Sequence, residues 1–230
     1  MAASSGPNII ETGLVLALDA ADKNSYPGTG TTWFDISGNN NNVGMAASTT
    51  ISLATFGNSI AFNLDVVGKY FNGTCTNNIA TNVTLEAWIY PAVTELSAGD
   101  RGTVILLTGT NGLYMSWNKS NQKMSNYWYG HPTEGYHENS NASNRSVWNH
   151  WCSVWDNTAS KLYQYTNGTK ASTDASTVGN AAAGTNLIIG RESDDRQFAG
   201  GLAVIRIYNI PLTSAQVLQN YNVTKSRFGL

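Results

Sequence analysis

The sequence predicts an all-β protein, a two-sheet antiparallel sandwich with one short C-terminal helix. Asn, Thr, Gly and Ser make up 94 of its 230 residues, and these residue types favour turns and strands over helix interiors. Ten or more short apolar runs follow one another at the spacing of a sandwich, with turn residues between them. The 7 Trp, 11 Tyr and 6 Phe residues can bury a large core, which argues against disorder.

The first expected strand is Leu14–Asp19, and a long polar connection rich in Gly and Asn follows it. Lys161–Thr166 and Thr169–Ala171 flank Asn167-Gly168, which predicts a β-hairpin with a type I′ turn because both turn residues tolerate positive φ. The other expected strands cover residues 59–63, 69–71, 83–90, 103–108, 112–117, 124–129, 147–156, 186–190 and 202–209.

The expected helix covers Thr213–Tyr221. Thr213 and Gln216 form a T-x-x-Q capping box, and Val217, Leu218 and Tyr221 share one face of the helix. Its length of about nine residues suits a helix that lies across the surface of the sandwich.

One domain is the expectation at this length, because all-β sandwiches often reach about 200–250 residues as a single unit. We expect residues 1–12 to form an extended arm, anchored by Ile9 and Ile10, and residues 13–230 to form the sandwich.

Charge and apolar runs exclude several kinds of partner. A net charge of −2 and a pI near 5.9 give no basic surface for nucleic acid. The longest apolar runs are far too short for insertion into a membrane. Cys75 and Cys152 have no C-x-x-C partner, so a metal knuckle is excluded, and whether the two thiols meet is left open.

Four stretches together resemble the laminin-G-like branch of the concanavalin A-like lectin/glucanase superfamily. They are an opening strand with a D-x-SGN-x-N turn (residues 13–42), the strand TLEAWIYP (84–91), a strand and hairpin (148–171), and a closing strand with its helix (198–222). The resemblance covers nearly the whole chain and implies the jelly-roll sandwich. The fold alone implies no function, since the same sandwich serves lectins, hydrolases and adhesion modules.

Two further stretches resemble laminin-G-like modules in structural proteins of tailed bacteriophages. They are the Tyr-Pro-Gly-x-Gly-x-x-Trp segment (26–33) and the ending NYNVTKSRFGL (220–230). This resemblance implies a virion structural protein, made in the host cytoplasm and displayed on the virion surface in many copies or as a homo-oligomer.

The sequence gives no support for catalysis. Glycoside hydrolases need two facing carboxylates, and the E-x-D-x-E strand of the related glucanases is absent. Glu86 stands alone in its strand, and we expect it to be a buried acid bonded to a neighbouring strand. His150 and Cys152 lie two residues apart, and we expect both to be packed rather than reactive. The expectation is therefore a non-enzymatic protein.

Calcium is a candidate ligand because several laminin-G-like modules bind one Ca²⁺ at the rim of the sandwich. Asp35, in the D-x-SGN turn, is the candidate metal ligand, since Ca²⁺ takes oxygen donors from loops rich in Asp and Asn. Ala203 stands where the family often has an acid, which weakens the match. Glu192, Asp194 and Asp195 form a second acidic cluster, and the flanking arginines make a salt-bridged turn an equal alternative.

An aromatic stretch at 124–137 is the candidate ligand site. Its candidate residues are Trp128, Tyr129, His131 and Tyr136, which could stack on sugar rings while Asn126 and Glu134 supply hydrogen bonds. The alternative is that Tyr127 and Tyr129 pack inward and that the loop contacts another protein chain.

The sequence as a whole favours a capsid decoration protein on the head of a tailed phage, bound to other virion proteins of the capsid shell. It lacks the coiled-coil, collagen-like and β-helix repeats of a fibre shaft, and residues 1–12 are the candidate attachment arm. The alternative is a carbohydrate-binding adhesin or tail-fibre module that attaches the virion to host surface glycans.

Overall fold

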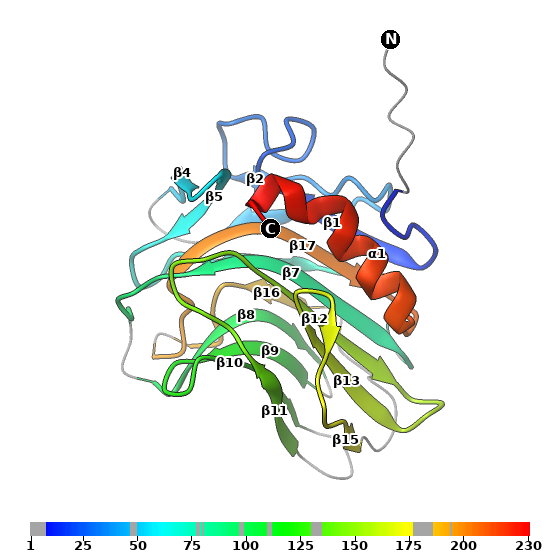
Figure 1. Ribbon diagram of the computed structural model, residues 1–230. Helices are drawn as coiled ribbons and strands as arrows, with labels where there is room; N and C mark the ends of the chain where they lie inside the picture. The colour runs from blue at the N-terminus through cyan, green and yellow to red at the C-terminus, as the bar shows by residue number, and fades with distance from the viewer. Residues whose placement is uncertain are drawn as a thin grey trace.

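The computed structural model describes residues 8–46, 50–76, 79, 81–96, 99–109, 112–129, 135–176, 186–193 and 195–230. The strands form two antiparallel sheets, one of nine strands and one of eight, that enclose a common core (Figure 1). The predicted jelly-roll sandwich with one short C-terminal helix is therefore confirmed. No helix within the described ranges has the length and hydropathy needed to cross a membrane.

The nine-stranded sheet, called sheet A here, lies next to the helix. Its main path runs through β14 (Thr169–Lys170), β13 (Lys161–Thr166), β12 (Asn149–Asp156), β7 (Val83–Pro91), β17 (Gly200–Tyr208), β5 (Ser59–Leu64) and β4 (Leu53–Phe56). Two further strands pair with β17 and β13 respectively, namely β1 (Leu14–Asp19) and β15 (Ala175–Ser176).

The eight-stranded sheet, called sheet B, forms the opposite layer. Its strands, in order, are β11 (Gly135–Ala142), β10 (Lys123–Tyr129), β9 (Gly112–Asn118), β8 (Arg101–Thr108), β16 (Asn186–Ile189), β6 (Phe71–Thr74), β3 (Val43–Met45) and β2 (Thr32–Trp33). The strands bow toward the helix, so the outer face of sheet B is the concave one (Figure 1).

Most expected strands lie within two residues of the observed ones. The sequence pattern missed the short strands β2, β3, β4 and β15, and it also missed β11. The expected strand at 124–129 is confirmed as β10, and residues 135–137 of the aromatic stretch belong to β11, which begins at Gly135. Polar residues dominate β11, so the apolar alternation that marks a half-buried strand is absent there.

Large aromatic side chains fill the space between the sheets. Trp33 and Phe71 each pack edge to face on Phe62 with ring centroids 4.8 Å apart, and they lie 5.1 Å from each other in a tilted arrangement. Trp117 stacks on Trp151 at 5.8 Å. All five rings are essentially inaccessible to solvent. Aromatic pairs of this geometry contribute about 0.5–1.5 kcal/mol beyond the burial of their area.

Helix α1 (Ser214–Thr224), followed by a 3₁₀ turn (Lys225–Phe228), crosses the outer face of sheet A (Figure 1). The predicted capping box is present: Gln216 N donates to Thr213 Oγ1 at 3.3 Å, and Thr213 N donates to Gln216 Oε1 at 2.9 Å. Two of the unpaired amides that begin a helix are thereby satisfied. The helix ends three residues later than predicted.

The predicted hairpin between β13 and β14 packs directly against α1. Asn167 and Gly168 have φ values of 50° and 73°, as a type I′ turn requires. A Cβ atom at Gly168 would lie 2.8 Å from Cδ1 of Tyr221, so only glycine combines this backbone conformation with this close approach. The hairpin and the helix therefore fix each other's position.

Because α1 covers the outer face of sheet A, the central strand β7 is buried on both faces. Glu86 in β7 lies directly opposite Arg206 in β17, and Arg206 Nη1 donates to Glu86 Oε1 at 2.5 Å. Asn220 in α1 donates to the second carboxylate oxygen at 2.7 Å. His150 Nε2 lies 3.2 Å from Glu86 Oε1. The expectation that Glu86 is a buried acid bonded to a neighbouring strand is confirmed.

Burial by itself would raise the pKa of Glu86. The Arg206 guanidinium, with His150 and Asn220, outweighs that effect and holds the pKa at about 2. Glu86 therefore stays ionised at neutral pH, and the charge it carries is matched inside the protein. The carboxylate joins β7 and β17 to α1.

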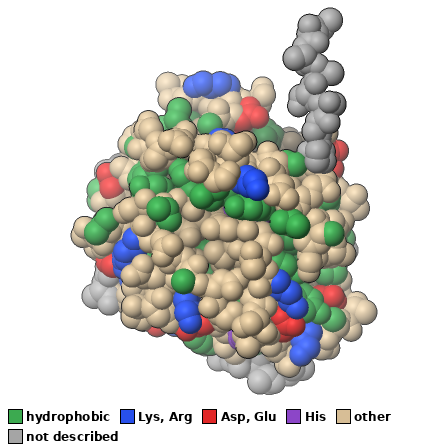
Figure 2. Space-filling view, in the orientation of Figure 1, with side chains coloured by type: hydrophobic (Ala, Val, Ile, Leu, Met, Phe, Trp, Pro, Cys, Tyr) green, Lys and Arg blue, Asp and Glu red, His purple; other side chains and the backbone are tan. Residues whose placement is uncertain are grey.

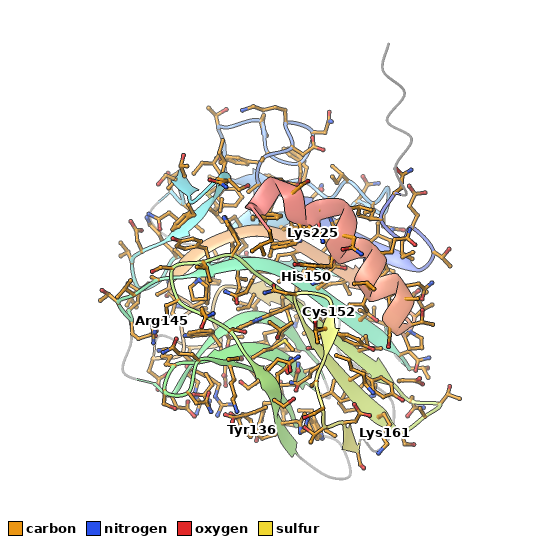
Figure 3. All side chains as sticks on the ribbon, viewed as in Figure 1. Tyr136, Arg145, His150, Cys152, Lys161 and Lys225 are labelled. Carbon is orange, nitrogen blue, oxygen red and sulfur yellow. The ribbon has the colours of Figure 1, made fainter. Side chains whose placement is uncertain are left out.

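His150 and Cys152 lie beneath α1, whereas Tyr136 lies at the far end of the molecule on β11 (Figure 3). His150 and Cys152 are both fully buried. Burial raises the pKa of the Cys152 thiol, which disfavours the reactive thiolate. Cys75 is also buried, but it packs between the two sheets. The expectation that His150 and Cys152 are packed is therefore confirmed.

Residues 8–12 of the expected arm lie along α1. The Ile10 amide donates to Asn220 Oδ1 at 2.8 Å, and Gln219 donates to the carbonyl of Asn8 at 2.7 Å. Ile10 also packs against the apolar cluster beneath the helix, as expected for an anchor. Residues 1–7 lie outside the described residues, and the domain boundary at residue 12 stays a prediction.

Charged side chains are sparse on the face that carries α1. Figure 2 shows Lys and Arg side chains interspersed with Asp and Glu among the described residues of this face. This distribution agrees with the low net charge of the sequence.

We expect Glu86→Ala to lower the free energy of unfolding by about 3–5 kcal/mol, because Arg206 is left buried without its carboxylate. Urea unfolding followed by tryptophan fluorescence measures the change. Glu11→Ala, at an exposed carboxylate, is the control and should stay within about 0.5 kcal/mol of the unmodified protein. Equal unfolding midpoints for the two variants would show that the buried pair does not stabilise the fold.

Candidate functional site

Four tyrosines gather on the concave outer face of sheet B. Tyr136 on β11, Tyr127 on β10 and Tyr114 on β9 lie directly opposite one another, and Tyr129 lies two residues beyond Tyr127 on the same face. The Tyr114 ring centroid is 5.7 Å from that of Tyr127 and 5.6 Å from that of Tyr129. We call these four side chains the tyrosine face. The register of three strands therefore places four aromatic rings side by side.

The tyrosines differ in exposure in a way that gives the face a floor and a rim. Tyr114 is buried, Tyr127 and Tyr129 are half-buried, and Tyr136 is 46% exposed. A Cβ atom at Gly112 would lie 1.8 Å from Cε1 of Tyr129, so the glycine leaves the space that this ring occupies. The rings are thus held in place by backbone and neighbours.

Arg101 packs between two of these rings. Its guanidinium carbon lies 5.3 Å from the centroid of Tyr127 and 5.9 Å from that of Tyr136. Its Nε donates to Asp100 at 3.2 Å, which restricts the guanidinium further. Contacts between a cation and an aromatic ring of this kind contribute about 0.5–1 kcal/mol at exposed sites. Arg101 therefore helps to keep the exposed Tyr136 in one orientation.

A polar cluster borders the tyrosine face. The Glu138 carboxylate accepts hydrogen bonds from the Tyr136 hydroxyl, from Asn118 Nδ2 at 2.5 Å and from Asn121 Nδ2 at 2.7 and 2.8 Å. Asn118 Nδ2 also donates to the Tyr136 oxygen at 2.9 Å. These side chains come from β9, its turn and β11. The cluster gives the face a fixed set of amide, carboxylate and hydroxyl groups.

Burial raises the pKa of Tyr136 to about 12, and the hydrogen bond to Glu138 adds to the rise. Burial would also raise the pKa of Glu138, but the donors Tyr136, Asn121 and Asn118 outweigh it and lower that pKa. The phenol therefore remains a donor and the carboxylate remains an acceptor at neutral pH.

This arrangement suits an uncharged polyhydroxylated ring. Aromatic side chains offer apolar faces that stack on the C–H faces of a sugar, while amide and carboxylate groups bond its hydroxyls. The side chains are already ordered by one another, so little conformational entropy is lost on binding.

The structure places the predicted ligand residues on two different faces of sheet B. Tyr129 and Tyr136 lie on the outer face, as the stacking hypothesis requires. Trp128 does not, because its side chain is only 5% exposed and packs edge to face on Trp155, with ring centroids 5.7 Å apart. We therefore reassign Trp128 to the core. His131 and Glu134 lie outside the described residues.

Two further expectations for residues 124–137 are wrong, because successive side chains of β10 alternate between the two faces of sheet B. Tyr127 and Tyr129 do not pack inward, since they lie on the outer face with Tyr114. Asn126 is fully buried and accepts hydrogen bonds from Ser153 and Gln164, so it is no surface donor. The site also contains five residues that were not predicted, which are Arg101, Tyr114, Asn118, Asn121 and Glu138. Counting every second residue along β9 and β10 would have found Tyr114 and Asn118.

Asp35 holds the long connection after β1 in place. Its Oδ1 accepts from the amides of Ala17 and Ser37 at 2.9 Å, and its Oδ2 accepts from Ser37 Oγ at 2.9 Å and from the Asn41 amide at 3.0 Å. The carboxylate is therefore used within the loop. Calcium binding at Asp35 stays a prediction.

The second acidic cluster forms a local ion pair, as one alternative expected. Arg196 Nη1 donates to Glu192 Oε1 at 2.8 Å, and Ser193 Oγ donates to Asp195 Oδ1 at 2.5 Å. Asp194 lies outside the described residues. Among the residues that the structure describes, no group of three or more His, Cys, Asp or Glu side chains is placed to hold a metal ion.

Residues 68–218 match the family described as the concanavalin A-like lectin/glucanases superfamily, under a laminin-G model. No curated protein matches the sequence. Among solved structures, domain 4 of AbnA, an extracellular arabinanase from Geobacillus stearothermophilus solved with arabinotriose, is similar at 16% identity and a TM-score of 0.70. That match covers 92% of this chain and 100% of the AbnA domain.

Two toxin domains are also similar. The binding domain of Paraclostridial Mosquitocidal Protein 1 matches at 18% identity and a TM-score of 0.68, over 92% of this chain. The ligand-binding domain of botulinum neurotoxin serotype D, solved with N-acetylneuraminic acid, matches at 16% identity and a TM-score of 0.68, over 93% of this chain. The present chain spans about half the length of each toxin chain, 52% in both cases. At these identities the likeness concerns the fold.

The placement of Trp128 in the core and Tyr136 at the surface predicts losses of stability of different size when each is replaced by alanine. We expect Trp128→Ala to lower the free energy of unfolding by about 3–5 kcal/mol, because it leaves a cavity in the core. Tyr136→Ala should cost about 1 kcal/mol or less, because its ring is at the surface. Urea unfolding curves of both variants test this, and similar losses for the two would contradict the assignment of Trp128 to the core.

Proposed function

The chain belongs to the concanavalin A-like lectin/glucanase superfamily, and on this premise we propose that it is a carbohydrate-binding protein whose site is the tyrosine face. The observation that carries the proposal is the alignment of Tyr114, Tyr127 and Tyr136 across three strands beside the cluster of Glu138. The similar domains solved with arabinotriose and N-acetylneuraminic acid support it, because both of those proteins bind carbohydrate on the same fold.

We propose further that the protein binds sugar without cleaving it. A glycosidase needs one carboxyl group that donates a proton and a second that acts as a base or nucleophile. The Glu138 carboxylate is ionised and accepts hydrogen bonds from three side chains, and Glu192 is paired with Arg196. The pKa of Glu138 is lowered, whereas a general acid needs a raised pKa.

Display on a tailed-phage virion stays a prediction from the resemblance of the two end segments of the sequence. Within that prediction, a glycan-binding face favours the adhesin or tail-fibre module over the capsid decoration protein. The reason is that a decoration protein needs an attachment surface for the shell and no site for sugar.

We expect Tyr136→Ala to weaken glycan binding about tenfold or more, or about 1.4 kcal/mol, because it removes the exposed ring of the site. A glycan array that includes arabino-oligosaccharides and N-acetylneuraminic acid conjugates identifies the bound sugar, and calorimetry measures its affinity. Tyr163→Ala is the matched control, since it removes a half-buried tyrosine on sheet A, far from the site. Equal losses in both variants, or binding to none of the glycans, would overturn the proposal.

Binding should be constant between about pH 5.5 and pH 9. The lowered pKa of Glu138 keeps it ionised throughout this range, and the pKa of Tyr136, about 12, keeps it protonated. The affinity of the best-bound glycan, measured at several pH values in this window, tests this. A steep change near pH 6.5 would instead point to a histidine in the site.

A further inference from the structure

The tyrosine face is one end of a longer line of residues across sheet B. Each member lies directly opposite the next on the neighbouring strand, so all of them point to the same outer face. From β11 to β6, the line runs through Tyr136, Tyr127, Tyr114, Leu106, Ile188 and Asn72. Neighbouring strands are about 4.8 Å apart, so these five steps span about 24 Å.

A pocket of about 250 Å³ lies at the far end of this line. Two of its lining residues, Asn72 and Ile188, belong to the line itself. The other polar and aromatic groups of its lining are Tyr70, Thr108, Asn186, Arg191 and Glu192. The concave face therefore has hydrogen-bonding groups at both ends.

The pocket repeats the chemistry of the tyrosine face with different residues. The Arg191 guanidinium carbon lies 3.9 Å from the centroid of the Tyr70 ring, so the two planar groups form a stacked pair. Asn72 offers an exposed amide, and Thr108 offers a half-exposed hydroxyl. These groups match the C–H face and the hydroxyls of a sugar ring, as the groups around Tyr136 do.

The pocket is held in shape by a buried glutamine. Gln197 accepts from the Gly68 amide at 2.7 Å and donates to the carbonyls of Val66 and Lys69 at 2.8 and 3.1 Å. These bonds tie the turn that precedes Tyr70 to the segment that follows Arg191. Both partners of the stacked pair are therefore fixed before any ligand binds.

Glu192 connects the two ends. It lines the pocket, and its carboxylate is close enough to Tyr114 to add to the rise that burial causes in the pKa of that tyrosine. Its Oε1 is bonded to Arg196, while its Oε2 has no hydrogen-bond partner among the described residues. That oxygen is itself buried, so Glu192 supplies a fixed negative charge between the two ends of the line rather than a direct contact for the ligand.

We infer that the tyrosine face and this pocket are two subsites of one site, and that the ligand is a linear, uncharged oligosaccharide that lies across the strands. This inference depends on the proposed function. One strand spacing is close to the length that one sugar residue adds to a chain, so the line accommodates on the order of five residues. Glu138 at one end and Glu192 between the subsites disfavour an acidic sugar.

The test is the dependence of affinity on chain length. We would titrate the protein with arabino-, cello- and chito-oligosaccharides of one to six residues. For the series that binds, the affinity should rise at least about tenfold between the disaccharide and the hexasaccharide, because a second subsite is engaged by the same molecule. Asn72→Ala and Thr108→Val should remove most of that rise. Tyr136→Ala should lower the affinity for the hexasaccharide as well.

Asn222→Ala is the matched control, because it removes an exposed asparagine on α1. Thermal unfolding checks that each variant folds. If short and long chains of the bound series have equal affinity, or if the hexasaccharide binds Asn72→Ala as tightly as it binds Asn222→Ala, the second subsite is overturned and the proposed function stands. If oligosaccharides of every length and acidic glycans all fail to bind, the proposed function is overturned together with the inference.

Discussion

The directly opposed register of β9, β10 and β11 is the constraint from which the proposed site follows. Side chains alternate between the two faces of a strand, so a shift of one residue would exchange the core and the outer face. In the observed register Trp128 enters the core and Tyr127 faces outward beside Tyr114 and Tyr136. The same constraint that completes the core therefore also assembles the aromatic surface.

The two outer faces of the sandwich have different roles because α1 covers only one of them. Beneath the helix, the buried carboxylate of Glu86 joins Arg206 to Asn220, and the surrounding strands are buried on both sides. A group in that position contributes to stability and has no access to a ligand. The concave face of sheet B carries its carboxylate, Glu138, at the surface, where it is held by side chains and is available to hydroxyl groups.

Most of the fold could be predicted from the sequence because its signals are local. The apolar run of β1, the Asn-Gly turn after β13 and the capping box at Thr213 each depend on neighbouring residues. The site could be predicted only in part. Tyr129 and Tyr136 were found by their aromatic character, but Trp128 was included for the same reason although it faces the core. Glu138 lies on β11, whose polar sequence gives no strand period, so its partners could not be foreseen.

A concave sheet surface has consequences for the strength of binding. The groups that would bond a sugar are already bonded to one another, as in the pair of Tyr136 and Glu138, so a ligand exchanges existing hydrogen bonds for new ones. Each subsite therefore contributes a modest free energy, and affinity has to come from repetition. Within one protein molecule, a longer glycan that reaches from Tyr136 to Asn72 occupies both subsites. Across several protein molecules, display in many copies raises the overall affinity of weak binding by about 10²–10⁴-fold through avidity. A protein that binds a surface polymer can use both, and the shallow site is then sufficient.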